Sequence, residues 1–229
     1  MRYFIAATFL ILISITTSAQ QINYADWQKE AQTDSRLLPK YGGLAKTQEQ
    51  VDADAEFTKT ALAELGTARK ASDYMVKNGF DFLAKGDPKN AIYRFNQAWL
   101  LDPTNENVFW GFGGVYFLLN DHAKALELYT EGIIINPKSA NIMIDMATIG
   151  LSRFNANKDE TELTGSVNLL KMAYEIDPTS QTLLFKLSIC YYFKNDCANA
   201  IKYYDECKKL GGKTLTEAYT KALAAKCKN

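Results

Sequence analysis

The chain has 229 residues, of which 47% are hydrophobic, and its 26 basic side chains balance its 26 acidic ones. This composition is too apolar and too evenly charged for a disordered chain, and it lacks the basic excess of a nucleic-acid-binding protein. With one histidine and no Cys-x-x-Cys pair, a zinc site or a histidine-based triad has almost no residues to draw on. We therefore expect no metal, no cofactor and no nucleic-acid partner.

Residues 1–19 have the order of a secretory signal peptide. Arg2 precedes an apolar run over residues 4–15, and Thr17 and Ala19 stand as in an A-x-A-like cleavage site. An uncut membrane anchor is the alternative, but a membrane span needs roughly 20 apolar residues. We expect cleavage after Ala19. The protein would then be exported, periplasmic or secreted from a bacterium, and would keep no stable membrane span after signal cleavage.

Residues 20–66 are predicted to form an N-terminal extension. A short helix is expected over residues 24–32. Residues 35–43 contain one Pro and two Gly without periodicity, which predicts an extended loop. Thr47 and Gln50 then have the spacing of a capping box, so a helix should begin there and reach about Leu65.

From residue 72 onward the sequence repeats itself. Three turns align without gaps, at residues 86–91, 120–125 and 195–200, and each places an Asp where a helix N-cap accepts backbone N–H bonds. A second set of turns carries a Pro that blocks helix continuation: Asp102-Pro103, Asn136-Pro137 and Asp177-Pro178. Equivalent residues of the first two units are 34 apart, a period that holds two helices and two turns.

The residues between these turns resemble the tetratricopeptide repeat (TPR), whose pattern is W-x2-L-G-x2-Y, then A-x3-F, then P. In residues 72–105 the matching series is Met75, Asn78-Gly79, Phe82, Ala91, Phe95, Ala98 and Pro103. In residues 106–139 it is Phe109, Phe112-Gly113, Tyr116, Ala125, Tyr129, Gly132 and Pro137. In residues 181–212 it is Leu184, Leu187-Ser188, Tyr191, Ala200, Tyr204 and Cys207.

The resemblance implies an all-α fold, a right-handed α-solenoid of about four TPR-like helix pairs. The repeats would occupy residues 67–212, as units 72–105, 106–139, 140–180 and 181–212. A C-terminal capping helix is expected in residues 213–229, because the last repeat would otherwise expose its apolar side. The N-terminal extension could cover the first repeat or lie in the groove of the solenoid.

The third unit departs from the period. Gly113 to Ala147 is 34 residues, but Ala125 to Ser166 is 41, so seven residues are inserted between Ala147 and Ser166. Because seven residues are about two helical turns, each helix of this pair could be one turn longer without changing its buried face. The polar residues 155–162 would then form a projecting tip, either a contact site or a tolerated surface insertion.

All four cysteines fall in the last 40 residues. Disulfides are allowed in an exported protein, and four cysteines permit three connectivities. The repeat register places Cys197 at the far end of a first-type helix and Cys227 near the far end of the capping helix beside it. We favour a disulfide between Cys197 and Cys227, with Cys190 and Cys207 as buried small apolar residues. Free thiols throughout are the alternative.

In the TPR family the first helix of each repeat lines a concave groove where ligand peptides usually lie. The Lys/Asn clamp of the chaperone-binding members is absent from this sequence, and apolar residues take one of its positions. Such a groove favours a helical or extended apolar partner segment. The alternatives are that the extension fills the groove or that these side chains are core. The candidate partner-binding residues are Val76, Phe80, Trp110, Phe117, Ile144, Phe185, Ile189 and Tyr192.

Charge is distributed unevenly along the chain. Residues 186–229 hold nine Lys against four acidic residues, whereas residues 20–66 hold five basic against eight acidic ones. Opposite ends could therefore attract a neighbouring copy, giving self-association, or an anionic envelope surface. A Lys-rich solvated helix face is the alternative explanation.

Enzyme readings have little support. His122 occupies the position of Pro88 and Cys197 in a repeat turn, so repeat drift explains it, and residues 111–114 (GFGG) lie inside an expected helix rather than after a strand. We expect a protein–protein interaction scaffold or adaptor in the cell envelope. A peptide or small-ligand binding module is the alternative, and an enzyme is the weakest hypothesis.

Overall fold

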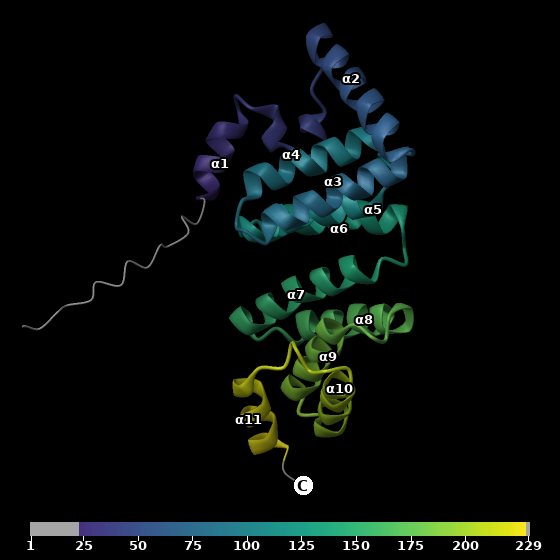
Figure 1. The fold of residues 1–229 in the computed structure, drawn as a ribbon. Helices are drawn as coiled ribbons and strands as arrows, with labels where there is room; N and C mark the ends of the chain where they lie inside the picture. The colour runs from purple at the N-terminus through teal and green to yellow at the C-terminus, as the bar shows by residue number, and fades with distance from the viewer. Residues whose placement is uncertain (1–22, 228–229) are drawn as a thin grey trace, which may run out of the picture.

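The computed structural model describes residues 23–227, and every regular element in that range is a helix (Figure 1). The expected signal peptide lies outside the described residues. The protein is a helical solenoid in which four helix pairs follow one another along the chain. The pairs are α3 (Ala68–Leu83) with α4 (Pro88–Leu101), α5 (Glu106–Leu118) with α6 (His122–Ile135), α7 (Ala140–Asn157) with α8 (Glu160–Ile176), and α9 (Gln181–Phe193) with α10 (Cys197–Lys209).

We call α3, α5, α7 and α9 the first helices and α4, α6, α8 and α10 the second helices. The turn inside three of the pairs is the same local structure. Asp87, Asp121 and Asp196 each accept the backbone N–H three residues further on, at 3.1, 3.0 and 3.1 Å, as the sequence predicts for N-caps. The preceding Gly or Asn adopts a positive φ, which lets the chain reverse within a few residues.

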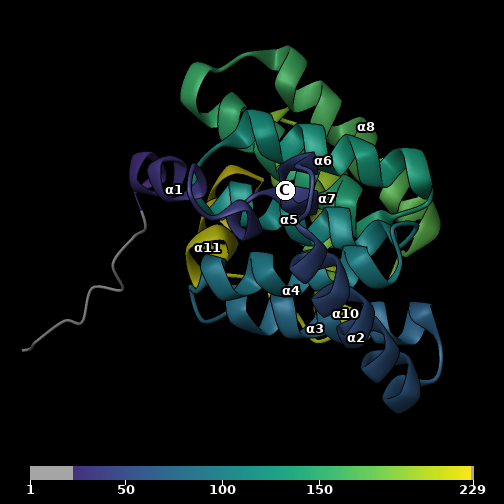
Figure 2. The ribbon, with the colours of Figure 1, turned by 90° about the horizontal axis from the view of Figure 1, so that it is seen from above.

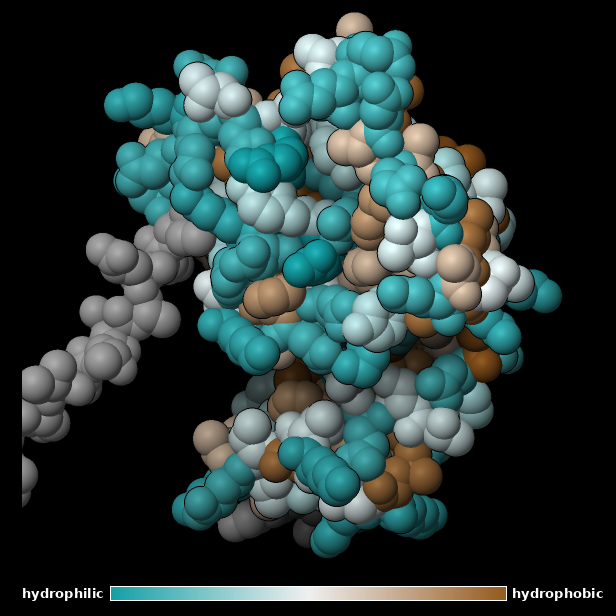
Figure 3. Space-filling model, turned by 45° about the horizontal axis from the view of Figure 1, so that its top comes forward, coloured by the Kyte–Doolittle hydropathy of each residue, from teal (hydrophilic) through white to brown (hydrophobic). Residues whose placement is uncertain are grey.

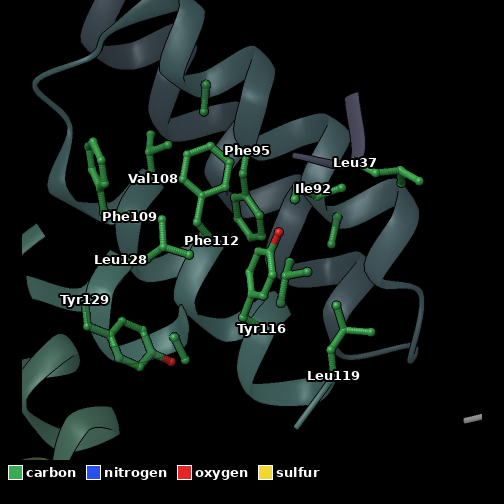
Figure 4. Packing of buried hydrophobic residues seen from close by; sticks show 14 of the residues in the cluster. Leu37, Ile92, Phe95, Val108, Phe109, Phe112, Tyr116, Leu119, Leu128 and Tyr129 are labelled. Atoms are coloured by element: carbon green, nitrogen blue, oxygen red, sulfur yellow. The ribbon is translucent and has the colours of Figure 1, made fainter. Parts of the chain in front are cut away.

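The pairs pack by setting aromatic rings against glycines. A Cβ added to Gly79 or Gly111 would stand 2.4 or 2.2 Å from the Phe95 ring, and one added to Gly113 would stand 2.1 Å from the Tyr129 ring. Each ring therefore occupies space that only glycine leaves free. Figure 4 shows Phe95 and Tyr129 in the core formed by the first two pairs.

The third pair is longer than its neighbours. Helices α7 and α8 have 18 and 17 residues, against 13 and 14 in α5 and α6. This confirms that the inserted residues lengthen both helices. The two helices meet at an exposed turn in which Lys158 is left-handed and Asp159 caps α8. At Gly150, where the family has an aromatic residue, the Ser166 hydroxyl fills the space that a Cβ would occupy.

The extension contains α1 (Tyr24–Ala31), two 3₁₀ helices (Ser35–Leu37 and Pro39–Gly43) and α2 (Gln48–Leu65). The expected loop over residues 35–43 is therefore wrong. Asp34 caps the first 3₁₀ helix by accepting the backbone N–H of Arg36. The chain then takes positive φ from Lys40 to Gly43, a conformation that costs energy at non-glycine residues.

A buried asparagine on α4 holds this turn in place. The Asn96 amide donates to the carbonyls of Arg36 and Leu38 at 2.8 and 2.9 Å, and its oxygen accepts the Tyr41 N–H at 3.4 Å. The Lys40 ammonium pairs with Glu131 of α6 at 2.7 Å. Long-range contacts with two second helices thus impose a backbone that local sequence does not favour.

The remainder of the extension docks at the outside of the stack (Figures 1 and 2). Trp27 and Leu37 are buried against the first two pairs, and the Tyr24 hydroxyl donates to Asp121 at 2.5 Å. Helix α2 begins with the predicted capping box of Thr47 and Gln50. It is anchored through its C-terminal half, where Ala61 is buried, and its other end extends beyond the stack.

The last helix, α11 (Glu217–Lys226), covers the end of the fourth pair. Tyr219 follows Phe185 by 34 residues, the repeat period, so α11 stands where the first helix of a further repeat would begin. Leu223 and Cys227 are its buried contacts with the pair beneath. The expected capping helix is present, and it begins a few residues later than residue 213.

Candidate protein-binding groove

The first helices supply all eight candidate groove residues, because the TPR period returns the same helix positions to one side of the stack. Six of these side chains are partly or largely accessible, and two are not. Val76 and Ile144 are 7% and 5% exposed and belong to the two hydrophobic cores. Their side chains support the groove rather than line it.

Aromatic rings form the part of the groove between the first two repeats. Phe80 of α3 and Trp110 of α5 lie with their ring centroids 4.2 Å apart, and Phe80 also contacts the buried Phe95 ring. Phe117 at the end of α5 is 37% exposed and stacks on the imidazole of His122 at 5.3 Å. Each ring therefore has one side fixed by the protein, which reduces the entropy lost when a partner covers the other side.

A polar contact that the sequence did not predict joins two first helices beside the candidate residues. The Trp110 indole N–H donates to the Asp145 carboxylate of α7 at 2.7 Å. Burial raises the pKa of Asp145, against the lowering effect of this hydrogen bond. Burial also lowers the pKa of Lys186 on α9, while the negative charge of Asp145 acts in the opposite direction.

Asp145 and Lys186 thus place opposite charges among apolar side chains, and the one N–H of Trp110 is already bonded to Asp145. A partner segment can satisfy such groups with its own main-chain amides or polar side chains. The sequence does carry a sign of these charges, because two successive repeats have a charged residue at the same first-helix position. Asp145 and Lys186 are 41 residues apart, the length of the enlarged third repeat.

The C-terminal end of the groove meets the capping helix. Tyr219 of α11 contacts Phe185 and Tyr192 in edge-to-face geometry, with centroids 5.4 and 5.8 Å apart. Ile189, one turn away on α9, is partly buried. The groove is therefore more open over the first three repeats than over the fourth.

The described part of the extension does not fill the groove. Its hydrogen bonds to the repeats reach Lys89, Tyr93 and Asn96 of α4, the cap residue Asp121 of α6, and Glu131. These residues lie on or next to second helices, whereas the candidate residues lie on first helices. Among residues 23–66, no hydrogen bond joins a candidate groove residue.

The cysteines occupy the end of the solenoid. Cys197, the first residue of α10, forms a disulfide with Cys227, the residue that ends α11, and their Cα atoms are 5.4 Å apart. This is the pair favoured from the sequence, although Cys197 begins a second helix instead of ending a first one. Cys190 and Cys207 are buried free thiols.

A small cavity lies away from the candidate residues, between α2 and the turn of the extension at Lys40 to Gly43. It has a volume of about 210 Å³ and is lined in part by Arg36, Tyr41, Lys46 and Asp54. Its two cationic side chains are already paired, Arg36 with Asp34 and Lys46 with Asp54. The charges around this cavity are therefore balanced within the protein.

Exposed hydrophobic residues also occur outside the groove. In Figure 3 hydrophilic residues cover the extension, while hydrophobic ones gather along one edge of the face in view. Ile134 of α6 and Met172 of α8 are 74% and 53% exposed. Because both lie on second helices, they provide comparison positions for residues in the groove.

The described residues offer neither a metal cluster nor a membrane span. Within residues 23–227, no group of three or more His, Cys, Asp or Glu side chains is arranged to hold a metal ion. None of the helices described is both long enough and apolar enough to cross a membrane.

A family model described as tetratricopeptide repeat matches residues 82–143, from the end of α3 to the start of α7. This match shows that residues 82–143 contain a tetratricopeptide repeat, and the stacked helix pairs show the same fold over the four pairs. The sequence match covers the second helix of the first repeat and all of the second repeat, where the pattern residues are most complete.

Known structures agree with this assignment at the level of the fold. The chain resembles PilF of Pseudomonas aeruginosa, with 14% identity, a TM-score of 0.55 and coverage of 70% of this chain and 67% of that one. A thermophilic TPR protein of Thermus thermophilus gives 16% identity, a TM-score of 0.56, and coverage of 68% and 80%. A chain in the APC/C hetero-tetramer Cut9–Hcn1 is 16% identical, with a TM-score of 0.52 and coverage of 77% of this chain and 32% of that one.

Proposed function

We propose that this protein is an interaction scaffold whose first helices bind a helical or extended apolar segment of a protein partner. The observation that carries the proposal is the set of partly accessible aromatic rings on first helices, Phe80, Trp110 and Phe117, beside the hydrogen bond from Trp110 to Asp145. Rigid aromatic residues supply large contact areas at a low entropy cost. Similarity to a chain from a hetero-tetramer fits a role in assembly, and TPR proteins are typically not enzymes.

Substitution in the groove tests this proposal. Trp110→Ala and Phe117→Ala should each weaken capture of the partner by tenfold or more, because each removes an anchoring ring. Ile134→Ala removes a more exposed apolar side chain from a second helix and should leave capture unchanged. Crosslinking and native pull-down of the tagged full chain would measure capture, and circular dichroism would check that the helices remain.

Equal capture by all three variants would refute the groove as the binding site. A loss of most of the helical signal in Trp110→Ala would instead assign that ring to the core. In that event Trp110→Phe provides the second test, because it keeps an aromatic ring while it removes the smaller ring of the indole and the N–H that bonds to Asp145. A small-ligand module would be supported if the groove variants changed binding of a small molecule and not of a protein.

We further propose that the protein acts in the cell envelope of a bacterium. The support is the order of charge, apolar run and small residues over residues 1–19. N-terminal sequencing of the protein recovered from the envelope fraction should begin at Gln20. Recovery from the cytosol with Met1 or Arg2 still present would contradict export.

A further inference from the structure

Helix α11 covers a surface that has the composition of a helix-binding site. Beneath it lie Phe185 and Tyr192 of α9 and Ile201 and Tyr204 of α10. The Tyr219 hydroxyl meets the hydroxyl of the buried Ser188 at 2.6 Å, and the Lys226 ammonium donates to the Tyr192 carbonyl at 2.7 Å. The surface thus offers aromatic contacts, a buried hydroxyl and the Tyr192 carbonyl, which also accepts the Asn195 N–H, to a helix with matching groups.

The connection to α11 allows it to move as a unit. Residues 210–216 link it to α10, and Gly211 and Gly212 in this linker adopt φ of 109° and 61°. Gln181 makes three hydrogen bonds to this linker, and backbone bonds to the end of α10 hold Leu210, Gly211 and Gly212. The two glycines can adopt other backbone conformations once α11 is released, so they provide the position of a hinge.

A third hydrogen bond joins Thr220 of α11 to Tyr204 of α10, and the helix itself is short. It is ten residues long, and Leu223 is the buried residue within it. Helices shorter than about 12–15 residues are marginal in water without tertiary contacts. The disulfide between Cys197 and Cys227 joins the far end of α11 to the start of α10, so it closes the covered surface at the end opposite the hinge.

We propose that the face of the fourth repeat under α11 is a second docking surface, for an amphipathic helix, and that the Cys197–Cys227 disulfide controls its availability. The chemistry of the partner helix follows from α11, which places Tyr219 and Leu223 four residues apart on one face. With the disulfide intact, α11 occupies the surface. With the disulfide reduced, α11 opens at the hinge and a partner helix binds in its place.

The opening step is a thiol–disulfide exchange. A dithiol reductant supplies two electrons and two protons, the bond between the two sulfur atoms breaks, and both cysteines become thiols while the reductant becomes a disulfide. Cys190 does not take over the pairing, because burial raises the pKa of its thiol to about 12 and keeps it protonated. This surface adjoins the candidate groove at Phe185 and Tyr192 and does not include Phe80, Trp110 or Phe117, which carry the proposed function.

Hydrogen–deuterium exchange of the full chain tests the opening. Reduction of the native protein should raise exchange in residues 217–226 at least tenfold and leave α3 to α8 unchanged. The double variant Cys197→Ser, Cys227→Ser should show the same exchange without reductant. Cys207→Ser, at a buried free thiol, should still need reduction. Thiol titration checks that reduction is complete. If α11 is then as protected from exchange as in the oxidised protein, the proposal is overturned.

A peptide tests the docking surface separately from the opening. The probe is a labelled peptide of residues 214–227 with Cys227→Ser, and fluorescence anisotropy measures its binding to the full chain. Binding should be at least tenfold tighter to the reduced chain than to the oxidised one. Equal binding to both forms would show that α11 does not occupy the site. Neither experiment uses the groove partner, so failure here is distinct from failure of the proposed function.

Discussion

The close contacts between glycines and aromatic rings decide how near the helices of neighbouring repeats can approach. Phe95 is fully buried between two glycines, and Tyr129 is 1% exposed against a third. Interiors are packed as densely as organic crystals, so a ring of this size has no room to shift when a methyl group is added beside it. These positions should therefore be the least tolerant of small-to-large substitution.

Two glycine substitutions with the same chemistry should change stability in opposite directions. Gly113→Ala places a methyl group in the space of the Tyr129 ring and should destabilise the protein by about 1–3 kcal/mol. At Gly165, in the middle of α8, a Cβ meets nothing within 4 Å. Gly165→Ala should stabilise by about 0.5–1 kcal/mol through helix propensity. Urea unfolding measures both, and a destabilised Gly165→Ala would contradict this account.

Asn96 is the residue on which the left-handed turn of the extension depends. Asn96→Ala removes the side-chain donor to the Arg36 carbonyl and one of the two donors to the Leu38 carbonyl, which keeps the Tyr41 N–H, and should cost about 1–3 kcal/mol. In this variant, hydrogen–deuterium exchange should rise more over residues 35–46 than over the repeats. The exposed Asn141 is the matched control, since Asn141→Ala should stay within about 0.5 kcal/mol of the wild type. Equal effects of the two variants would show that Asn96 is not the anchor.

Among the elements, the extension has the strongest dependence on charged contacts. The guanidinium of Arg36 hydrogen-bonds to Asp34 and holds the pKa of that carboxyl at about 2, below its ordinary value of 3.8. The Tyr93 hydroxyl of α4 donates to the same carboxylate at 2.9 Å. Asp34 therefore joins the first 3₁₀ helix to the first repeat more strongly while it is ionised.

Acid should release this contact in a defined pH window. Because the pKa of Asp34 is lower in the folded state than in the unfolded state, its ionised form stabilises the protein above about pH 4. That contribution is lost as the pH falls from about 4 to 2, and it amounts to roughly 1 kcal/mol after solvent screening. Asp34→Asn should remove this part of the acid sensitivity. An unchanged acid profile in the variant would contradict the assignment.

The elements differ in how far the sequence could predict them. The Asp-capped turns and the capping box were predictable because each requires only a side chain and a backbone N–H three residues away. The turn at Lys40 and Tyr41 was not, because Asn96 and Glu131 impose it from distant positions in the chain. The pairing of Trp110 with Asp145 was missed for a similar reason, since it depends on how two repeats are placed against each other.

At the scale of the whole molecule, two hydrophobic cores follow one another along the solenoid. The first is centred on the first two repeats and includes Ile142 and Ile149 of α7, and the second runs from α7 to α10. Close approach of α6 and α7 depends on Gly132, where a Cβ would stand 2.5 Å from Ile142. Helix α7 thus belongs to both cores and ties the two halves of the groove together.

The extension and α11 lie in different positions relative to the candidate groove residues. The extension forms its hydrogen bonds to the repeats on second helices and their caps, and it meets first helices at Tyr116 and Ala71, which are not candidate residues. Tyr219 of α11 covers Phe185 and Tyr192. The length of groove available to a partner is therefore set by the first three repeats. A partner segment should contact Phe80, Trp110 and Phe117 in the oxidised protein.

Site-specific photo-crosslinking tests the central claim, that the first helices bind a protein partner, most directly. A photoreactive phenylalanine analogue is placed at Phe117, on a first helix, or at Ile134, on a second helix, in the full chain expressed in its native host. We predict one discrete crosslinked partner from position 117 and none of that species from position 134. The same crosslinked species from both positions, or from position 134 alone, would contradict the claim.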